Sequence, residues 1–350
     1  MNETITPRQA HILNIIISSD NISRKGILDE IKRTYPISRP TLIRDLNALF
    51  RQNRIKIIGK GPITKYVSYE ECPLFKKFDT DAYFSVDPDL RKAKKIFDFT
   101  VFRHIKGLFN QDEIAVLQNT KRSFSKSISQ LDPSILKREL ERFVIEMSWK
   151  SSKIEGNTYT LLETESLIKE RIEAKGKSKN EAIMILNHKK AFDMILEYRV
   201  DFTLISISTL CQLHNILVKD LNISKGIRNQ AVGITGTIYT PLDNEHQIRE
   251  AVEKMINLVN ATENPLEKAL IVHFFIPYTQ PFADGNKRTA RLMTNAILLA
   301  YDMFPLSYRS VNEDEFKKAL ILFYEQQSIT AIKKIFIDQF RFANNSYFKS

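Results

Sequence analysis

The segment that most constrains the fold of this chain is a polar stretch of twelve residues, QPFADGNKRTAR at 280–291, between two apolar runs. LIVHFFIPY precedes it and LMTNAILLAY follows it, and both runs are long enough to form buried helices. The twelve residues include three cationic side chains, one carboxylate, and a glycine and an asparagine that tolerate unusual backbone angles. We therefore expect a charged loop held between two core helices.

The composition of this loop favours the binding of a polyphosphate. Asp284, Gly285 and Asn286 can direct successive backbone N–H groups toward one point, because glycine and asparagine tolerate positive φ. A helix that begins just after them would add its positive N-terminal end, with Arg288 and Arg291 on adjacent turns. Asp284, the single anion among these cations, is a suitable ligand for Mg²⁺ that bridges phosphate oxygens. A solvated basic turn at a helix start is the alternative that composition alone leaves open.

The same residues resemble the signature of the Fic family, whose catalytic domain has the all-α Fido fold. The signature is His-x-Phe-x-(Asp/Glu)-Gly-Asn-x-Arg-x-x-Arg, and its positions are matched here by Phe282, Asp284, Gly285, Asn286, Arg288 and Arg291. The resemblance implies a domain that binds ATP and Mg²⁺ and usually transfers AMP to a hydroxyl side chain of a target protein. It also implies that Asp284 holds the metal, that Gly285 and Asn286 form the anion site, and that the two arginines bind phosphates.

A second segment, SSKIEGN at 151–157, is similar to the inhibitory motif of the family, (Ser/Thr)-x-x-x-Glu-(Gly/Asn). Ser151, Glu155 and Gly156 occupy its fixed positions. In relatives the glutamate pairs with the second arginine of the signature, here Arg291, and obstructs the γ-phosphate position. Because the segment precedes the signature, the resemblance implies the class with an inhibitory helix N-terminal to the Fic core.

A third segment, VGITGTIYTPL at 232–242, has two short β-like runs about a Thr-Gly turn in a region that is otherwise helical. It lies where the family has its flap, a β-hairpin that covers the nucleotide and pairs with an extended segment of the target. GIRNQ just before it, with Gly226 and Arg228, also resembles the family, and the resemblance covers about residues 110–340. The predicted flap residues are Gly236, Thr237, Ile238 and Tyr239.

Two positions depart from the family pattern. Gln280 stands in place of the histidine that takes the proton from the target hydroxyl, and an amide cannot act as a base near neutral pH. Loss of a general base costs about 10²- to 10⁴-fold in rate. We count Lys287 among the phosphate-binding residues. With Asn286 it forms an Asn-Lys pair, and in the Doc branch of the fold such a pair accompanies kinase-type phosphoryl transfer. Arg291 favours the geometry of AMP transfer, because it is the second arginine of the AMP-transferring pattern.

Other side chains are poor replacements for the missing base. His273 precedes Gln280 by two helical turns, about 10 Å along a helix axis, and lies in an apolar run. His214, in CQLHNIL, has similar neighbours, so both are interpreted as packed core histidines. Tyr278 is closer, but an unperturbed tyrosine has a pKa of about 10. The usual base is therefore missing.

The first seventy residues hold a net charge of +6 out of +11, from twelve Lys and Arg against six Asp and Glu. PRQAHILNIII, SRKGILDEIKRTY and SRPTLIRDLNALFRQN have helical apolar spacing, the last with Leu42, Leu46 and Leu49 as its buried stripe, and RIKIIGKGPITKYVSY alternates like a hairpin. This pattern resembles a winged helix-turn-helix of bacterial transcriptional regulators, which favours duplex DNA as a partner over a packing or dimerisation role. The predicted DNA-binding residues are Arg39, Thr41, Arg44, Lys60 and Lys65.

The expected fold is mainly α: a winged helix of three helices plus a β-hairpin over 1–70, a connector over 71–110, and an all-α Fido domain over 111–350 that includes the inhibitory helix and a β-hairpin flap. Two distant cysteines, Cys72 and Cys211, predict neither a disulfide nor a zinc site. The N-terminus lacks a signal-peptide pattern, and no run of eighteen apolar residues occurs. We expect a cytoplasmic protein with no membrane partner.

These patterns predict an ATP-binding protein adenylyltransferase that is weak or atypical because of Gln280, restrained by Glu155, and coupled to a DNA-binding module. Three alternatives stay open: a catalytically inactive, ATP-sensing transcriptional regulator, a protein that removes AMP from a modified target, and a Doc-like phosphotransferase. The expected partners are ATP with Mg²⁺, an unidentified target protein and duplex DNA. The sequence leaves the target, the operator and the oligomeric state open, a homodimer included.

Overall fold

The computed structural model describes residues 5–17, 19, 21–52, 54–59, 61–68, 73–129 and 132–347. The chain divides into two compact units. Met1–Lys76 and Arg103–Gly107 form the smaller unit, and Lys77–Phe102 and Leu108–Ser350 form the larger one. Lys60 and Cys72 lie outside the described residues.

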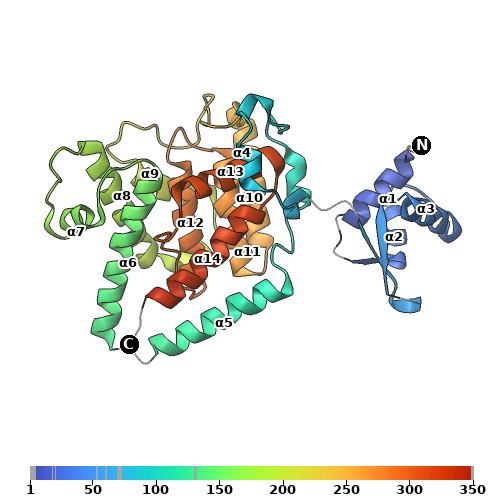
Figure 1. Cartoon of the computed structure of the whole chain (residues 1–350), viewed down its shortest axis with the longest axis horizontal. Helices are drawn as coiled ribbons and strands as arrows, with labels where there is room; N and C mark the ends of the chain where they lie inside the picture. The colour runs from blue at the N-terminus through green and yellow to red at the C-terminus, as the bar shows by residue number, and fades with distance from the viewer. Residues whose placement is uncertain are drawn as a thin grey trace. The chain divides into compact units, whose positions relative to one another are not determined.

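The smaller unit combines α-helices with a small antiparallel sheet (Figure 1). Its described elements are α1 (Pro7–Ile17), β1 (Ile22–Ser23), α2 (Arg24–Ile31), α3 (Arg39–Arg51), β2 (Ile55–Ile58) and β3 (Lys65–Ser68), with two 3₁₀ turns at Gly61–Ile63 and Pro73–Phe75. β3 pairs with β1 on one side and β2 on the other. Ser23 and Ser38 begin α2 and α3, since their side chains accept hydrogen bonds from the backbone N–H groups of Gly26 and Thr41.

The core of the smaller unit follows the predicted apolar spacing. Leu42, Leu46 and Leu49 of α3 are buried, and they belong to a cluster that includes Ile12 and Ile27. A helix with apolar residues at this spacing buries one face and leaves the other to solvent. α3 therefore presents Arg39 and Arg44 outward.

The larger unit is mainly α. Its helices are α4 (Thr80–Phe84), α5 (Gln111–Ile128), α6 (Pro133–Ile154), α7 (Leu161–Glu170), α8 (Lys179–Glu197), α9 (Ile207–Leu217), α10 (Glu245–Ala261), α11 (Pro265–Thr279), α12 (Asn286–Ala300), α13 (Glu313–Gln326) and α14 (Thr330–Ser346). Shorter 3₁₀ turns lie at Pro88–Leu90, Phe99–Arg103 and Arg199–Thr203. Among the helices that the structure describes, none combines the length and apolar character needed to cross a membrane.

Two neighbouring helices, α11 and α12, form the centre of the larger unit (Figure 1). α11 is buried around its whole circumference from Lys268 to Thr279, as expected for a helix that is apolar on every side. α8, α9 and α10 pack against this pair from one part of the chain, and α13 and α14 from another. The two predicted core helices are thus present, but the loop that joins them is shorter than the predicted 280–291, because residues 286–291 form the first turns of α12.

The predicted β-hairpin over 232–242 is wrong. The segment has a turn at Thr235–Gly236 and one isolated parallel bridge, between Thr240 and Ile96, but no paired strands. Several of its polar groups bind neighbouring helices: the Thr237 hydroxyl donates to Glu325 of α13, and the Tyr239 hydroxyl donates to the backbone of α11 at Tyr278. These long-range bonds replace the cross-strand ladder that alternation alone suggests.

Candidate functional site

The loop between α11 and α12 begins and ends with left-handed residues. Gln280 ends α11 with φ of 48°, and Gly285 precedes α12 with φ of 80°. A Cβ atom on Gly285 would lie at ordinary contact distance, 3.4 Å from Val218 and 3.5 Å from the Arg288 guanidinium, so it is the backbone angle that favours glycine. α12 starts at Asn286, and the N–H groups of its first turn have no partner within the helix. The loop therefore presents the N-terminal end of a helix.

Asn286 holds this loop closed with its side chain. Its Oδ1 accepts from the Phe282 N–H at 2.9 Å, while its Nδ2 donates to the Phe282 carbonyl at 2.8 Å and to Gln280 Oε1 at 2.7 Å. All of the amide is used inside the loop. Any contribution of Asn286 to an anion site must therefore come from its backbone.

Gln280 is bound at both ends of its amide. Its Nε2 donates to the Pro277 carbonyl at 2.8 Å, and its Oε1 accepts from Asn286. The carbonyl of Pro277 needs such a donor, because the residue four positions later is Pro281, which has no N–H. Arg228 completes the cap, donating to the carbonyls of Gln280 at 2.6 Å and Pro281 at 3.0 Å. The amide of Gln280 therefore braces the loop.

His214 of α9 contacts the loop at Asp284 and Phe282. Its Nε2 lies 2.9 Å from the Asp284 carbonyl oxygen, and its ring stacks on Phe282 with centroids 3.7 Å apart and planes 5° from parallel. Burial lowers the pKa of His214 to about 4, so the neutral ring donates from Nε2 to this carbonyl. Sequence reasoning interpreted His214 as a packed core residue and missed this contact, because α9 lies about seventy residues before the loop and no local spacing relates the two.

The other proposed replacements for a base are buried. His273 lies in the core, where Nδ1 contacts Thr294 Oγ1 at 3.2 Å and the Tyr308 hydroxyl at 3.1 Å, and burial lowers its pKa to about 3. The interpretation of His273 as a core residue is confirmed. Burial also raises the pKa of Tyr278 to about 12. Neither group can accept a proton from a substrate at neutral pH.

Asp284 is the most accessible charged group of the loop. Its side chain is 67% exposed, with Oδ1 accepting from the Gly285 N–H at 2.6 Å and Oδ2 lying 3.4 Å from Arg288 Nη2. Within the described residues, no group of three or more His, Cys, Asp and Glu is arranged to hold a metal. A metal here would need oxygen ligands from a bound molecule or from water in addition to Asp284, which is the usual coordination of Mg²⁺.

Arg288 and Arg291 are buried below the loop, with 2% and 0% of their surface exposed. Arg288 Nη1 has no hydrogen-bond partner in the part of the chain that the structure describes. Arg291, by contrast, has a partner at each of its three nitrogens: Nε donates to Ser151 Oγ at 2.9 Å, Nη2 to the Ser151 carbonyl at 2.8 Å, and Nη1 to Glu155 Oε1 at 2.9 Å. Arg288 thus has a nitrogen available for a ligand, whereas the nitrogens of Arg291 already bind α6 and the residue that ends it.

Glu155 joins α6 to the loop through two cations. Its Oε1 pairs with Arg291, and its Oε2 lies 2.9 Å from Lys287 Nζ. Burial alone would raise the pKa of Glu155, but Arg291 and Lys287 outweigh it and lower the pKa to about 2. Gly156 follows with φ of 94° and allows the chain to leave the helix. Lys287 therefore contacts a carboxylate in this structure, a contact that the sequence analysis did not predict.

Glu155, Gln280 and residues 283–287 line a cavity of about 550 Å³, whereas Arg288 and Arg291 are not among its lining residues. Charged and polar residues from the loop and α6 form one part of its wall, and Gly236 of the 232–242 segment contributes to another. Ile238 is half-buried and is not among the lining residues. The aromatic and apolar part of the wall comprises Phe84, Val232, Ile234, Leu320, Ile321 and Tyr324.

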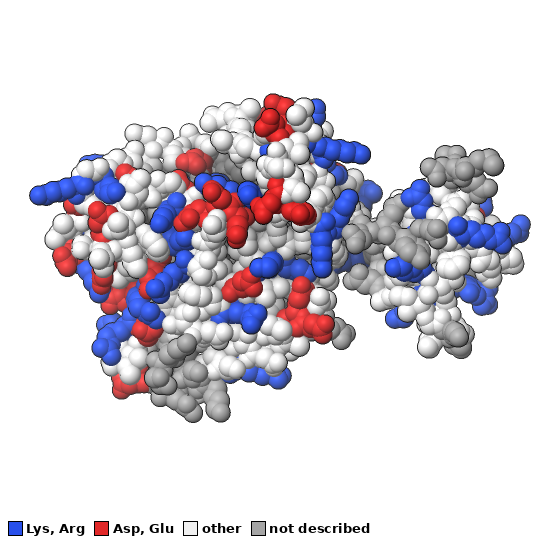
Figure 2. Space-filling model, viewed as in Figure 1, with Lys and Arg blue, Asp and Glu red and all other residues white. Residues whose placement is uncertain are grey.

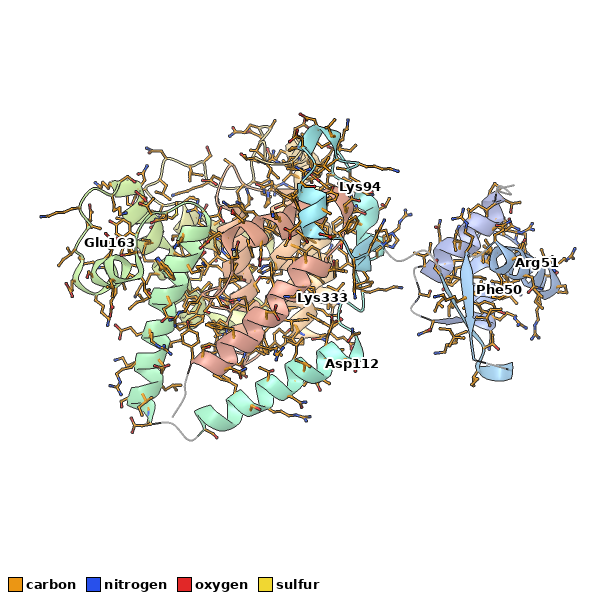
Figure 3. The ribbon with its side chains drawn as sticks, in the orientation of Figure 1. Phe50, Arg51, Lys94, Asp112, Glu163 and Lys333 are labelled. Atoms are coloured by element: carbon orange, nitrogen blue, oxygen red, sulfur yellow. The ribbon has the colours of Figure 1, made fainter. Side chains whose placement is uncertain are left out.

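The predicted DNA-binding residues lie on the smaller unit. Arg39, Arg44 and Lys65 are exposed and Thr41 is half-buried, whereas Lys60 is outside the described residues. Figure 2 shows mainly Lys and Arg among the charged side chains on the visible face of this unit, and Figure 3 labels Arg51 at the end of α3. Arg8 of α1 fixes α3 through Asp45, with Nε 2.7 Å from Oδ2 and Nη2 3.1 Å from Oδ1.

Comparison with known proteins agrees with this geometry. Residues 204–298, which include the loop, match the model of the Fic/DOC family. This part of the chain is therefore similar to the Fic/DOC family. The chain is 27% identical over 184 residues to the protein adenylyltransferase Fic of Drosophila erecta, covering 52% of this chain and 37% of that protein. The corresponding Fic protein of Nematostella vectensis is 27% identical over 201 residues, covering 53% of this chain and 44% of the relative. The match thus spans less than half of each of these proteins.

Solved structures of Fic proteins share the fold. Fic-1 of C. elegans superposes with a TM-score of 0.57 at 15% identity and covers 98% of both chains. A Fic-domain signalling protein of Bacteroides thetaiotaomicron gives a TM-score of 0.54 at 20% identity, over 68% of this chain and 99% of that one. At these identities the likeness concerns the fold alone.

Proposed function

We propose that this protein binds ATP with Mg²⁺ in the cavity and transfers AMP to a hydroxyl group of a target protein, from a site that Glu155 keeps restrained. The observation that carries the proposal is the pairing of Glu155 with both Arg291 and Lys287 next to the helix-capping loop. Protein adenylyltransferases are among the relatives of this chain, which supports the choice of AMP as the transferred group.

The residues fit a magnesium–triphosphate. Mg²⁺ would neutralise phosphate charge and polarise the bond that breaks. Asp284, with its exposed carboxylate, would hold the metal. The N–H groups at the start of α12 and the unpaired Nη1 of Arg288 would bind phosphate oxygens. Arg291 could bind a phosphate only after it releases Glu155.

Transfer would join the target oxygen to the α-phosphorus, break the bond to pyrophosphate and release one proton from the hydroxyl. Gln280 cannot accept that proton, since an amide is not a base near neutral pH and both of its polar atoms are already bonded. The proton must leave to water. Transfer is expected to be about 10²- to 10⁴-fold slower than with a positioned base.

The bonding of Gln280 also favours a second candidate function, an ATP-sensing regulator without transfer activity. In this case ATP would displace Glu155, and the change would reach a DNA-binding module formed by the smaller unit. The exposed Arg39, Arg44 and Lys65 and the arrangement of three helices with a β2–β3 pair support a winged helix with α3 as the DNA-reading helix.

Mass spectrometry of the chain incubated with Mg-ATP and a cell lysate separates these functions. A target or self-adduct of one AMP, increased by Glu155→Gly and further by Gln280→His, is the expected result for the restrained transferase. An added phosphate would indicate Doc-like transfer, and loss of AMP from a modified protein would indicate the reverse reaction. Bound ATP without any adduct in the double variant would leave the regulator and refute the transferase.

A further inference from the structure

One part of the cavity wall comes from a segment far outside the residues that match the family. Phe84 lines the cavity, and it belongs to α4 in the segment Lys77–Phe102. The family match begins only at residue 204. This segment therefore adds an aromatic ring to a site whose charged part lies in the loop before α12.

The ring of Phe84 is fixed by its neighbours. The Arg91 guanidinium lies 5.0 Å from its centroid, and Tyr83 packs edge to face against it with centroids 5.2 Å apart and planes at 77°. Arg91 is in turn fixed by α13, because its Nη1 lies 3.2 and 3.1 Å from the two carboxylate oxygens of Glu325. Both partners are buried, with side chains 4% and 0% exposed. Phe84 thus occupies a defined position.

The same buried pair holds the segment 232–242, a second part of the wall. Arg91 Nη2 donates to the Gly236 carbonyl at 2.8 Å, and the Thr237 hydroxyl donates to Glu325 Oε1 at 2.5 Å. The backbone N–H of Lys94, labelled in Figure 3, donates to the Glu325 carbonyl at 2.9 Å. This bond attaches the segment Lys77–Phe102, which carries Phe84, to α13. One ion pair therefore positions both the Phe84 ring and the turn at Gly236.

We propose that Phe84 stacks against the base of the bound nucleotide and that Arg91 is a positioning residue for this contact. The inference rests on the proposed function, since it assumes a nucleotide in the cavity. The charged part of the wall suits phosphates, and the part with Phe84, Ile321 and Tyr324 suits a flat, weakly polar ring. Aromatic side chains bind bases of any sequence because every base has a π face.

Calorimetry with two probes tests the stacking contact. In a Glu155→Gly background, Phe84→Ala should weaken Mg-ATP binding at least about fivefold and leave binding of Mg-tripolyphosphate, which has no base, unchanged. Phe84→Tyr should restore ATP binding. Leu90→Ala is the matched control, because Leu90 belongs to the same segment, is 77% exposed and does not line the cavity.

Equal weakening of both probes, or unchanged ATP binding, would overturn the stacking role while the nucleotide site itself stands. If the Glu155→Gly protein binds neither probe, the proposed function fails first and the stacking role with it.

Positioning by Arg91 needs milder variants, since Arg91→Ala would leave the buried Glu325 carboxylate unpaired and could prevent folding. Arg91→Lys keeps the charge but replaces the two nitrogens that bind Glu325 and the Gly236 carbonyl with a single one, and Thr237→Val removes one bond to Glu325. Both should speed hydrogen–deuterium exchange in residues 232–240 and weaken ATP several-fold more than tripolyphosphate. Wild-type exchange and wild-type ATP affinity in both folded variants would refute the positioning role.

Discussion

Removing the carboxylate of Glu155 should make the cavity bind Mg-ATP more tightly. In the structure both oxygens of Glu155 hold cations, Arg291 on one side and Lys287 on the other. A terminal phosphate that uses either cation has to displace this carboxylate. Glu155→Gly removes the side chain, and Glu155→Gln removes the charge while keeping the volume, so the two variants separate steric from electrostatic obstruction.

The size of the effect follows from the pKa of Glu155. A fall from an ordinary value of 4.5 to about 2 corresponds to about 3 kcal/mol of net interaction between the carboxylate and its surroundings. The side chain is only 15% exposed, so solvent screens this interaction little. Relief of the whole interaction would tighten ATP binding by up to about 10²-fold. Arg291 keeps its two bonds to Ser151, which should hold the observed gain below this limit.

Titration calorimetry at pH 7.5 on wild-type protein and both variants measures the gain. We expect both variants to bind Mg-ATP about 10- to 100-fold more tightly than wild type and to have a lower free energy of unfolding. Glu165→Gln is the matched control, because Glu165 pairs with Lys169 on the exposed surface of α7, 2.8 Å apart, and should change neither quantity. Unchanged ATP affinity in both folded Glu155 variants would refute the obstruction by this carboxylate.

Four further outcomes follow from the same contacts. Arg288→Ala should weaken ATP by about 1.5 to 3 kcal/mol, the contribution of a charge-assisted hydrogen bond, and unchanged calorimetric affinity would remove Arg288 from the site. Lys287→Ala should weaken ATP binding more in a Glu155→Gly background than in the wild type, because only there is the ammonium free of its carboxylate, and additive effects in this double-mutant cycle would contradict the shared carboxylate. The free energy of unfolding of the wild-type protein should exceed that of the Glu155→Gln variant by its full amount above pH of about 4.5. The difference should shrink as pH falls toward about 2, because the pKa of Glu155 is lowered in the folded state. Denaturant unfolding at a series of pH values measures the difference, and a difference that stays constant contradicts the prediction. In the full chain, Arg44→Ala should weaken salt-dependent binding to duplex DNA more than Lys92→Ala, and equal anisotropy curves would argue against α3 as the DNA-reading helix.

The features that local patterns determine could be predicted from the sequence. The two apolar runs on either side of the polar loop became α11 and α12, because a run that is apolar on every side can be buried only as a central helix. Leu42, Leu46 and Leu49 recur at helical spacing and are buried together. Gly285 has the positive φ that its place in the loop suggested. Each of these predictions depends on neighbours within about one helical turn.

The features that depend on distant residues could not be predicted in this way. Alternation in 232–242 suggested a hairpin, but Arg91 and Glu325, which lie about 145 and 90 residues away, take its polar groups. Lys287 was expected near phosphate, and its contact with Glu155 depends on how α6 packs against α12. Phe84 lies outside the region of family resemblance, so no motif pointed to it. In each case tertiary contacts override the local pattern.

Gln280 illustrates how one side chain can serve the fold and limit the chemistry. The loop needs a donor for the Pro277 carbonyl and an acceptor for the Asn286 amide, and the amide of Gln280 supplies both from one end of the side chain. Because an amide does not titrate near neutral pH, these two bonds persist across the physiological range. An imidazole would have to divide its two nitrogens between the same tasks, and protonation would convert the acceptor into a donor facing the Asn286 N–H. A histidine at this position could donate to the Pro277 carbonyl with one nitrogen and keep the other nitrogen free as a base. The Asn286 amide would then lose its acceptor at residue 280 and keep only its bond to the Phe282 carbonyl. Because its amide holds the loop in place, Gln280 has no free polar atom for proton transfer.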